Sequence, residues 1–183
     1  MHPKVKICGM TNAETIQTAI KHKVDYLGFV FYPKSPRNLT PDQAKELTKN
    51  IPQNVKRIAV LVNAKDEFIE QIKDYFDCFQ LHGHEDVKRI KELKQKFNKG
   101  IIKAIRVTDE ASARTFSQFE DEVDMLIFDS PAMEKTAKFD WQILTKLKIT
   151  KPYLIAGSIN INNVDEILNN CQKSKIKTII VKF

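Results

Sequence analysis

Glycine is scarce in this sequence, with five residues among 183, and proline is only slightly more frequent, with seven. These counts exclude collagen-like and other low-complexity classes. Hydrophobic residues make up 42% of the chain and charged residues 29%, which is typical of a globular protein with a real core and argues against disorder. We therefore expect one domain over residues 1–183.

Long apolar runs and a cysteine framework are also absent. No run of about 18 apolar residues occurs, so no membrane span is expected. The first residues do not have the pattern of a secretory signal. Cys8, Cys78 and Cys171 are odd in number and widely spaced, which argues against a disulfide framework and favours a reducing compartment. The sequence therefore predicts a cytoplasmic protein.

The net charge of +7 lacks the clustering that nucleic-acid-binding proteins show. Lysines recur on helix-like segments such as VKRIKELKQKFNKG at 87–100, where they are typical of a solvated helix face. We therefore expect no nucleic-acid partner. The excess of positive charge does favour anionic substrates, because the field of the protein steers them towards it.

Short apolar runs, often rich in β-branched residues, recur at regular intervals along the chain. Such near-continuous runs are typical of parallel strands that are covered on both faces. They occupy residues 4–8, 26–31, 57–62, 78–82, 101–107, 125–129, 153–157 and 178–183.

Amphipathic segments with helix-start signals separate these runs. TNAE at 11–14 and TPDQ at 40–43 are interpreted as capping boxes, and Thr108 is expected to cap another helix. Alternation of strands and helices predicts an α/β fold. Eight parallel strands favour a closed (β/α)8 barrel, the TIM barrel, over a doubly wound sheet. No G-x-G-x-x-G follows the first strand, which weakens a dinucleotide-binding interpretation.

The last predicted strand ends the sequence, so we expect a barrel that lacks its eighth helix. Such a barrel exposes apolar surface around the last strand. The expected consequence is a monomer of reduced stability or a weak homodimer that covers the gap.

Polar residues stand at or just after the ends of the predicted strands, where barrels of this kind carry their active sites. Strand alternation places Lys6 with Cys8 on one face, and Gln80 with His82 on one face. So many unrelated polar residues at one rim indicate a site. The set is Cys8, Arg37, Gln80, His82, Arg106, Asp129, Gly157 and Ser158.

Other interpretations of single residues stay open. Cys8 is also compatible with a core cysteine, and Asp129 with a helix cap. The HGHE segment, with His82, His84 and Glu85, looks like a metal cluster, but its spacing fits no common zinc pattern and no metal is expected.

Several segments together resemble the phosphoribosylanthranilate isomerases of tryptophan biosynthesis. The likeness runs in order from Lys4 to about Val164. The segments are KICGMTNAETIQTAI, YLGFVFYPKSPRNLTPDQA, FQLHG, IKAIRV, FDW and IAGSININNV.

This resemblance implies a cofactor-free Amadori rearrangement of N-(5-phosphoribosyl)anthranilate to 1-(2-carboxyphenylamino)-1-deoxyribulose 5-phosphate. It implies Cys8 as general base, Asp129 as general acid and Arg37 as the ligand of the anthranilate carboxylate. Such a reaction needs an acid for the ring oxygen and a base for the neighbouring carbon, on opposite sides of the sugar. The remaining expected substrate-binding residues are Gln80, His82, Arg106, Gly157 and Ser158.

Two departures from the family concern the phosphate. The family's glycine-rich GGTGKTFDW loop corresponds to SPAMEKTAKFDW at 130–141, which has no glycine, and no DVSSGVE-like turn follows the last strand. Glycines let the backbone approach an anion closely. Impaired activity is therefore expected. Alternatives are a degenerate or truncated copy, another sugar-phosphate barrel enzyme, and a non-catalytic phosphate-ligand or protein-binding barrel.

Overall fold

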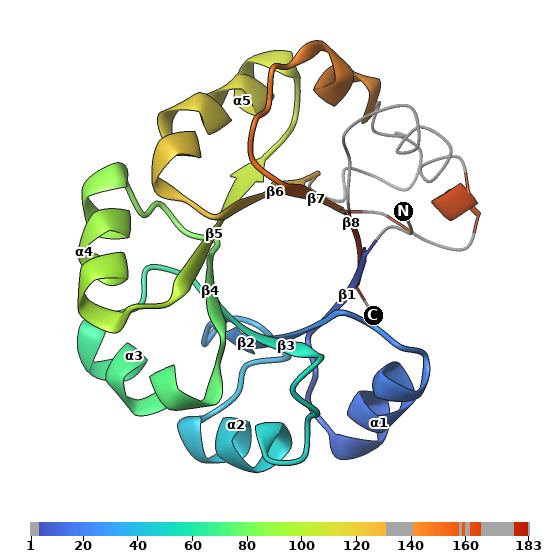
Figure 1. Cartoon of the computed structure of the whole chain (residues 1–183), viewed down its shortest axis with the longest axis vertical. Helices are drawn as coiled ribbons and strands as arrows, with labels where there is room; N and C mark the ends of the chain where they lie inside the picture. The colour runs from blue at the N-terminus through green and yellow to red at the C-terminus, as the bar shows by residue number, and fades with distance from the viewer. Residues whose placement is uncertain (1–3, 131–140, 158, 160–161, 166–177, 183) are drawn as a thin grey trace.

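Eight parallel strands form a closed barrel in chain order in the computed structural model (Figure 1). The structure describes residues 4–130, 141–157, 159, 162–165 and 178–182. The predicted barrel is confirmed, with each strand within one residue of its predicted limits. The strands are β1 (Lys4–Cys8), β2 (Tyr26–Phe31), β3 (Lys56–Leu61), β4 (Cys78–Leu81), β5 (Gly100–Arg106), β6 (Met125–Asp129), β7 (Tyr153–Ala156) and β8 (Thr178–Lys182).

Helices form an outer layer around the strands (Figure 1). Among the described residues β8 is the last element, and no helix there is long and apolar enough to cross a membrane. The α-helices are α1 (Ala13–Lys21), α2 (Pro41–Thr48), α3 (Asp66–Ile72), α4 (Val87–Phe97) and α5 (Glu110–Arg114). Short 3-10 helices are η1 (Lys73–Tyr75), η2 (Thr115–Gln118), η3 (Glu120–Glu122) and η4 (Trp141–Lys146).

One of the three predicted helix starts is confirmed and two are wrong by one residue. Thr40 caps α2 in a capping box, as predicted. In α1, Asn12 rather than Thr11 accepts the cap hydrogen bond. In α5, Asp109 holds the cap position that was expected for Thr108. Asparagine and aspartate are the stronger N-cap residues, which explains both shifts.

Alternation along the strands sorts the buried side chains into two layers. The outer layer packs between strands and helices and contains aromatic pairs such as Phe29 and Phe76, whose ring centroids are 5.5 Å apart. The inner layer is aliphatic except for buried polar residues that include Lys6, Gln80 and Asp129. Its apolar members are Cys8, Val30, Ile58, Val60, Ile102, Ala104, Ile127, Leu154 and Ala156.

An aspartate precedes β2, β4 and β6 and ties each of these strands to the one before it. Asp25, Asp77 and Asp124 each accept a hydrogen bond of 2.8 Å from a backbone N–H near the start of the preceding strand. Their own backbone N–H groups donate to the carbonyl of that same residue at 2.9 Å. These clamps lie at the amino-terminal rim, where barrels of this kind carry stability rather than catalysis.

The clamp at Asp77 gives a test of this stabilising role. Burial favours the protonated form of Asp77, but hydrogen bonds from Arg57 outweigh it and hold the pKa of this carboxyl below its ordinary value. A lowered pKa contributes stability above the unfolded-state pKa, and that contribution is lost as the pH falls through the folded-state value. We expect Asp77→Asn to lower the free energy of unfolding by about 1–3 kcal/mol at pH 7.

Denaturant unfolding at pH 7 and at about pH 3 measures this effect, and the gap to the wild type should narrow at the lower pH. Asp74→Asn, which changes an exposed carboxylate of the same segment, is the matched control and should change stability by less than about 0.5 kcal/mol. A gap of equal size at both pH values would contradict the assignment.

Candidate active site

A cavity of about 330 Å³ opens inside the barrel at the carboxyl ends of the strands. Its walls are the apolar inner-layer residues near this end. Its polar lining comes from β1, β4, β6 and the loops after β2 and β4, and includes Lys6, Cys8, Tyr32, Ser35, Arg37, Gln80, His82 and Asp129. Five of the eight predicted rim residues thus line one cavity rather than separate surfaces.

Cys8 is the last residue of β1 and is 5% exposed. The chain turns away immediately after it at Gly9, whose φ of 96° is a conformation that side chains rarely tolerate. The N–H of Gly9 donates to the carbonyl of Gly28 at 2.8 Å, which extends the ladder to β2 by one hydrogen bond. The thiol therefore stands on a rigid strand end, where it lines the cavity.

Arg37 reaches back from the loop after β2 and lies against this turn. A Cβ at Gly9 would collide with the Arg37 guanidinium, so glycine is required for the approach. Nη1 of Arg37 donates to the carbonyl oxygen of Cys8 at 2.9 Å, and the backbone N–H of Arg37 donates to Oγ of Ser35 at 3.1 Å. A half-buried guanidinium is thereby held beside the cysteine at the mouth of the cavity.

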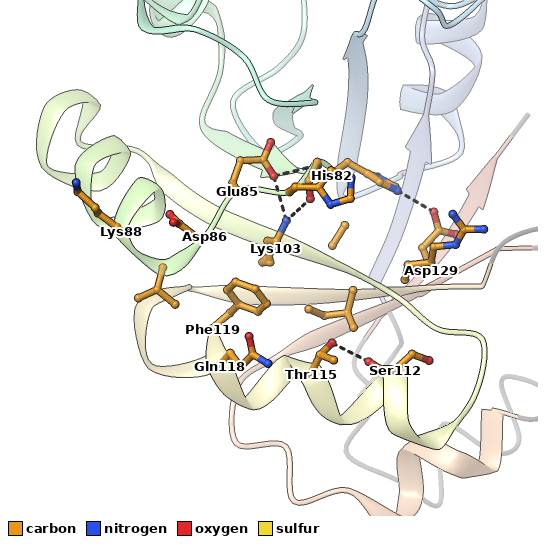
Figure 2. A pocket seen from close by; sticks show the side chains of 16 residues that line it. His82, Glu85, Asp86, Lys88, Lys103, Ser112, Thr115, Gln118, Phe119 and Asp129 are labelled. Carbon is orange, nitrogen blue, oxygen red and sulfur yellow. Dashed lines mark hydrogen bonds and ion pairs between the residues drawn. The ribbon is translucent and has the colours of Figure 1, made fainter.

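Gln80, His82 and Asp129 form a row of side chains on the facing strands. Nε2 of Gln80 lies 3.2 Å from Nδ1 of His82, and Nε2 of His82 lies 3.3 Å from Oδ2 of Asp129. Figure 2 shows the imidazole pointing at the carboxylate. An amide nitrogen only donates, so Nδ1 is the acceptor and the ring proton stays on Nε2, directed at Asp129. Gln80 thus selects the tautomer that orients the carboxyl group.

A second hollow of about 830 Å³ continues outward from His82 and Asp129, between the start of α4 and the segment formed by α5 and η2 (Figure 2). Arg106 ends β5, is paired in register with Asp129 and is exposed in this hollow. The structure therefore places Arg106 beside Asp129, at the wider entrance, and not in the packed barrel interior.

Glu85 belongs to the HGHE segment, and its carboxylate has structural partners. It forms an ion pair of 3.0 Å with Lys103, and both side chains are 4% exposed. It also accepts backbone hydrogen bonds from Asn63 at 2.7 Å and from Gly83 at 2.9 Å. This pair joins the loops after β3 and β4 to β5. Figure 2 shows the Glu85 carboxylate directed at Lys103. Among the described residues no cluster of His, Cys, Asp and Glu could hold a metal ion.

Of the residues predicted to lie near the substrate phosphate, the structure describes Gly157. Gly157 follows β7 with a φ of 99°, and a Cβ there would collide with the carbonyl oxygen of Ser130. This glycine is therefore needed for the close approach of two strand ends. Ser158 and the loop 131–140 lie outside the described residues.

A family model described as N-(5'-phosphoribosyl)anthranilate (PRA) isomerase matches residues 5–179. The chain belongs to the PRA isomerase family. The resemblance that the sequence segments indicated is thereby confirmed.

Named relatives and solved structures agree with the family. The N-(5'-phosphoribosyl)anthranilate isomerase of Bradyrhizobium diazoefficiens is 34% identical over 173 residues, which are 90% of this chain and 78% of that protein. A PRA isomerase crystallised with reduced 1-(o-carboxyphenylamino)-1-deoxyribulose 5-phosphate has a TM-score of 0.85 and 28% identity, covering 100% of this chain and 87% of that one. Monomers generated from the dimeric Thermotoga maritima enzyme have a TM-score of 0.83 and 26% identity, with 100% and 87% covered.

Sequence reasoning missed the residues that support this PRA isomerase site from outside the cavity. Lys103 lies in the middle of the apolar run IIKAIRV, and a charged residue inside a buried strand is the signal that could have exposed it. Asn63 gave no such signal, although its Oδ1 accepts a hydrogen bond of 2.8 Å from His84.

Removing Glu85 should destabilise the loops that carry His82. Glu85→Ala leaves the Lys103 ammonium buried without its carboxylate, and breaking a buried ion pair on one side costs about 3–5 kcal/mol. Denaturant unfolding should show a loss of this size. The double variant Glu85→Leu with Lys103→Met removes both charges and is the matched control, which should recover much of the loss. Equal losses in both variants would show that the pair itself does not matter.

Proposed function

We propose that this protein is a phosphoribosylanthranilate isomerase of tryptophan biosynthesis. The reaction converts N-(5-phosphoribosyl)anthranilate to 1-(2-carboxyphenylamino)-1-deoxyribulose 5-phosphate, with no cofactor. The observation that carries the proposal is the presence of Cys8 and Asp129 in one cavity at the carboxyl end of the barrel, in a chain of this family. A barrel that only binds a ligand needs neither an acid nor a base there.

The first step assigned to the site is ring opening by Asp129. Its carboxyl group donates a proton to the ribose ring oxygen, the bond from that oxygen to C1 breaks, and the nitrogen of anthranilate completes an imine at C1. Asp129 is 7% exposed and lines the cavity, which places its carboxyl group beside a sugar bound there. The hydrogen bond from His82 holds the carboxyl group in one orientation towards the cavity.

The second step is removal of the proton on C2 by the thiolate of Cys8. The electrons of the C2–H bond form the C1–C2 double bond while the π electrons of the protonated imine return to nitrogen, which gives an enolamine that tautomerises to the ketone of the product. Cys8 on β1 and Asp129 on β6 are separated by β7 and β8 around the closed barrel, so a sugar placed between them meets the acid and the base from different directions.

Arg37 is the proposed ligand of the anthranilate carboxylate. Its planar guanidinium matches a carboxylate with two parallel hydrogen bonds. The contact with the Cys8 carbonyl places this group at the mouth, so the aromatic ring would lie near the entrance while the sugar lies deeper. For the phosphate we propose the backbone at Gly157 and Ser158, in keeping with the phosphate sites that barrels form after strands seven and eight.

We also propose that the enzyme is cytoplasmic, binds no nucleic acid and is a monomer or a weak homodimer. Cysteine usage supports the first point, and the dispersed lysines support the second. The altered phosphate loop is the argument for a degenerate copy. Retention of Cys8, Asp129 and Arg37 in one cavity favours an active enzyme, and complementation of a tryptophan auxotroph that lacks the isomerase decides between the two.

Loss of substrate fluorescence provides the direct test of the two catalytic groups. Cys8→Ala and Asp129→Asn should each lower kcat by about 10²- to 10⁴-fold, the usual contribution of general acid–base catalysis. Cys78→Ala removes a thiol that lies at the start of β4, away from the cavity, and is the matched control with unchanged kcat. Full activity in either catalytic variant would refute the mechanism.

Arg37→Lys separates binding from chemistry. Lysine keeps the charge but cannot reproduce the planar fork, and a hydrogen bond to a charged group is worth about 1.5–3 kcal/mol. We expect KM to rise by about ten- to a hundredfold with a smaller change in kcat. Lys34→Ala removes an exposed cation from the same loop and controls for general electrostatic attraction. Similar KM changes in the two variants would mean that Arg37 acts only as one charge among many.

A further inference from the structure

Lys6 is a buried lysine whose role the two-residue mechanism leaves open. It is 0% exposed, stands two residues before Cys8 on the same face of β1, and lines the cavity. Within the part of the chain that the structure describes, its Nζ has no hydrogen-bond or ion-pair partner. An ammonium taken out of water without a partner is costly, so lysine at such a position needs a reason.

Gly28 brings this ammonium close to the thiol. It is paired in register with Cys8 on the neighbouring strand β2. A Cβ at Gly28 would lie 2.8 Å from Sγ of Cys8 and 2.8 Å from Nζ of Lys6. Nζ of Lys6 and Sγ of Cys8 therefore lie at most 5.6 Å apart, twice the distance of each atom from this Cβ position. Because Gly28 has no side chain, no methyl group fills the space next to them.

We propose that Lys6 is a positioning residue that holds Cys8 as the thiolate in the free enzyme. The proton leaves Sγ and is bound by the amine Nζ, so an ammonium–thiolate pair replaces an amine–thiol pair with no change in net charge. An opposite charge within about 4–6 Å favours the charged form of each partner. The inference rests on the proposed function of Cys8 as the base, and it supplies the means by which that base is ionised before substrate arrives.

Other charged or titratable groups lie near Lys6 and Cys8. Their charges also affect how the ionisation of Cys8 depends on pH. Arg37 is a second cation beside Cys8 and also favours the thiolate, whereas the Asp129 carboxyl group on the facing side opposes it when ionised. The remaining groups are Tyr32 and His82 in the cavity and Tyr26 as the register neighbour of Lys6. All of these stay in place when Lys6 alone is changed.

The rate of alkylation of Cys8 by iodoacetamide as a function of pH tests the proposal, because only the thiolate reacts. The full chain carries Cys78→Ser and Cys171→Ser, so that Cys8 is the only thiol. Burial raises the pKa of the Cys78 thiol, with Asp77 and Asp124 adding to the effect, so its removal takes away only a slow background reaction.

In this background Lys6→Met should shift the midpoint of the alkylation profile upward by about one to three pH units. Lys4→Met changes an exposed lysine two residues earlier on the same strand and is the matched control, with no shift expected. Titration of thiolate absorbance near 240 nm measures the same midpoint without a reagent. Should Lys6→Met not fold, Lys6→Gln removes the charge with a polar side chain and gives the same comparison.

An unchanged midpoint in a folded Lys6 variant would overturn the inference, whatever the enzyme activity. If the chain lacks isomerase activity while the midpoint still shifts, the proposed function fails and the lysine–cysteine pair stands. In an active enzyme, Lys6→Met should lower kcat at pH 7 more than it changes KM, and activity should recover towards high pH. A loss of kcat of equal size at every pH would show that Lys6 has only a structural role.

Discussion

Closure of the sheet between β8 and β1 is the constraint on which the site depends. Five residue pairs join these two strands, from Lys4 with Thr178 to Cys8 with Lys182, whereas only two pairs join β7 to β8. Without this pairing β1 would be an edge strand, its inner face would meet water, and neither Lys6 nor Cys8 would be enclosed. The buried cavity, and the thiol chemistry proposed for it, are therefore consequences of ring closure rather than of any single contact near the cysteine.

The two ends of the barrel use polar residues in different ways. At the amino-terminal rim the three aspartate clamps satisfy backbone groups, whereas the cavity lined by Cys8 and Asp129 lies at the other end. At the carboxyl rim the Glu85–Lys103 pair does a similar task, but it lies outside the sheet, behind the loops that carry His82. The Glu85–Lys103 pair thus supports from outside the loop that carries His82. This separation lets the inner face keep groups that are directed at a ligand.

The sequence was sufficient to predict the strands and most residues of the carboxyl-terminal rim. Apolar runs indicate buried parallel strands, and the last residues of those runs lie at the rim where barrels of this kind carry their sites. It was insufficient wherever a residue acts through a partner distant in the chain. Asp25, Asp77 and Asp124 each follow an apolar residue and precede a strand, a repeated pattern whose meaning appears only when the preceding strand is seen beside it. The sequence YLGFVF gave no sign that Gly28 matters, because the space beside this glycine depends on which residues of β1 lie opposite it.

Some buried polar groups among the described residues have partners and others have none. Those without a partner lie at the site, so they locate it without any comparison with related proteins. Glu85 and Lys103 are buried and have partners for their charges. Lys6 Nζ and Gln80 Oε1 are equally buried, line the central cavity and have none within the described residues. Native proteins rarely leave such groups without a partner, because each costs about 1–3 kcal/mol or more if charged. A polyhydroxylated sugar, whose hydroxyl groups both donate and accept, offers an amide oxygen the donor it lacks, while a thiolate offers the ammonium its counter-charge. The Gln80 oxygen without a partner is thus the reason to expect a ligand inside the barrel.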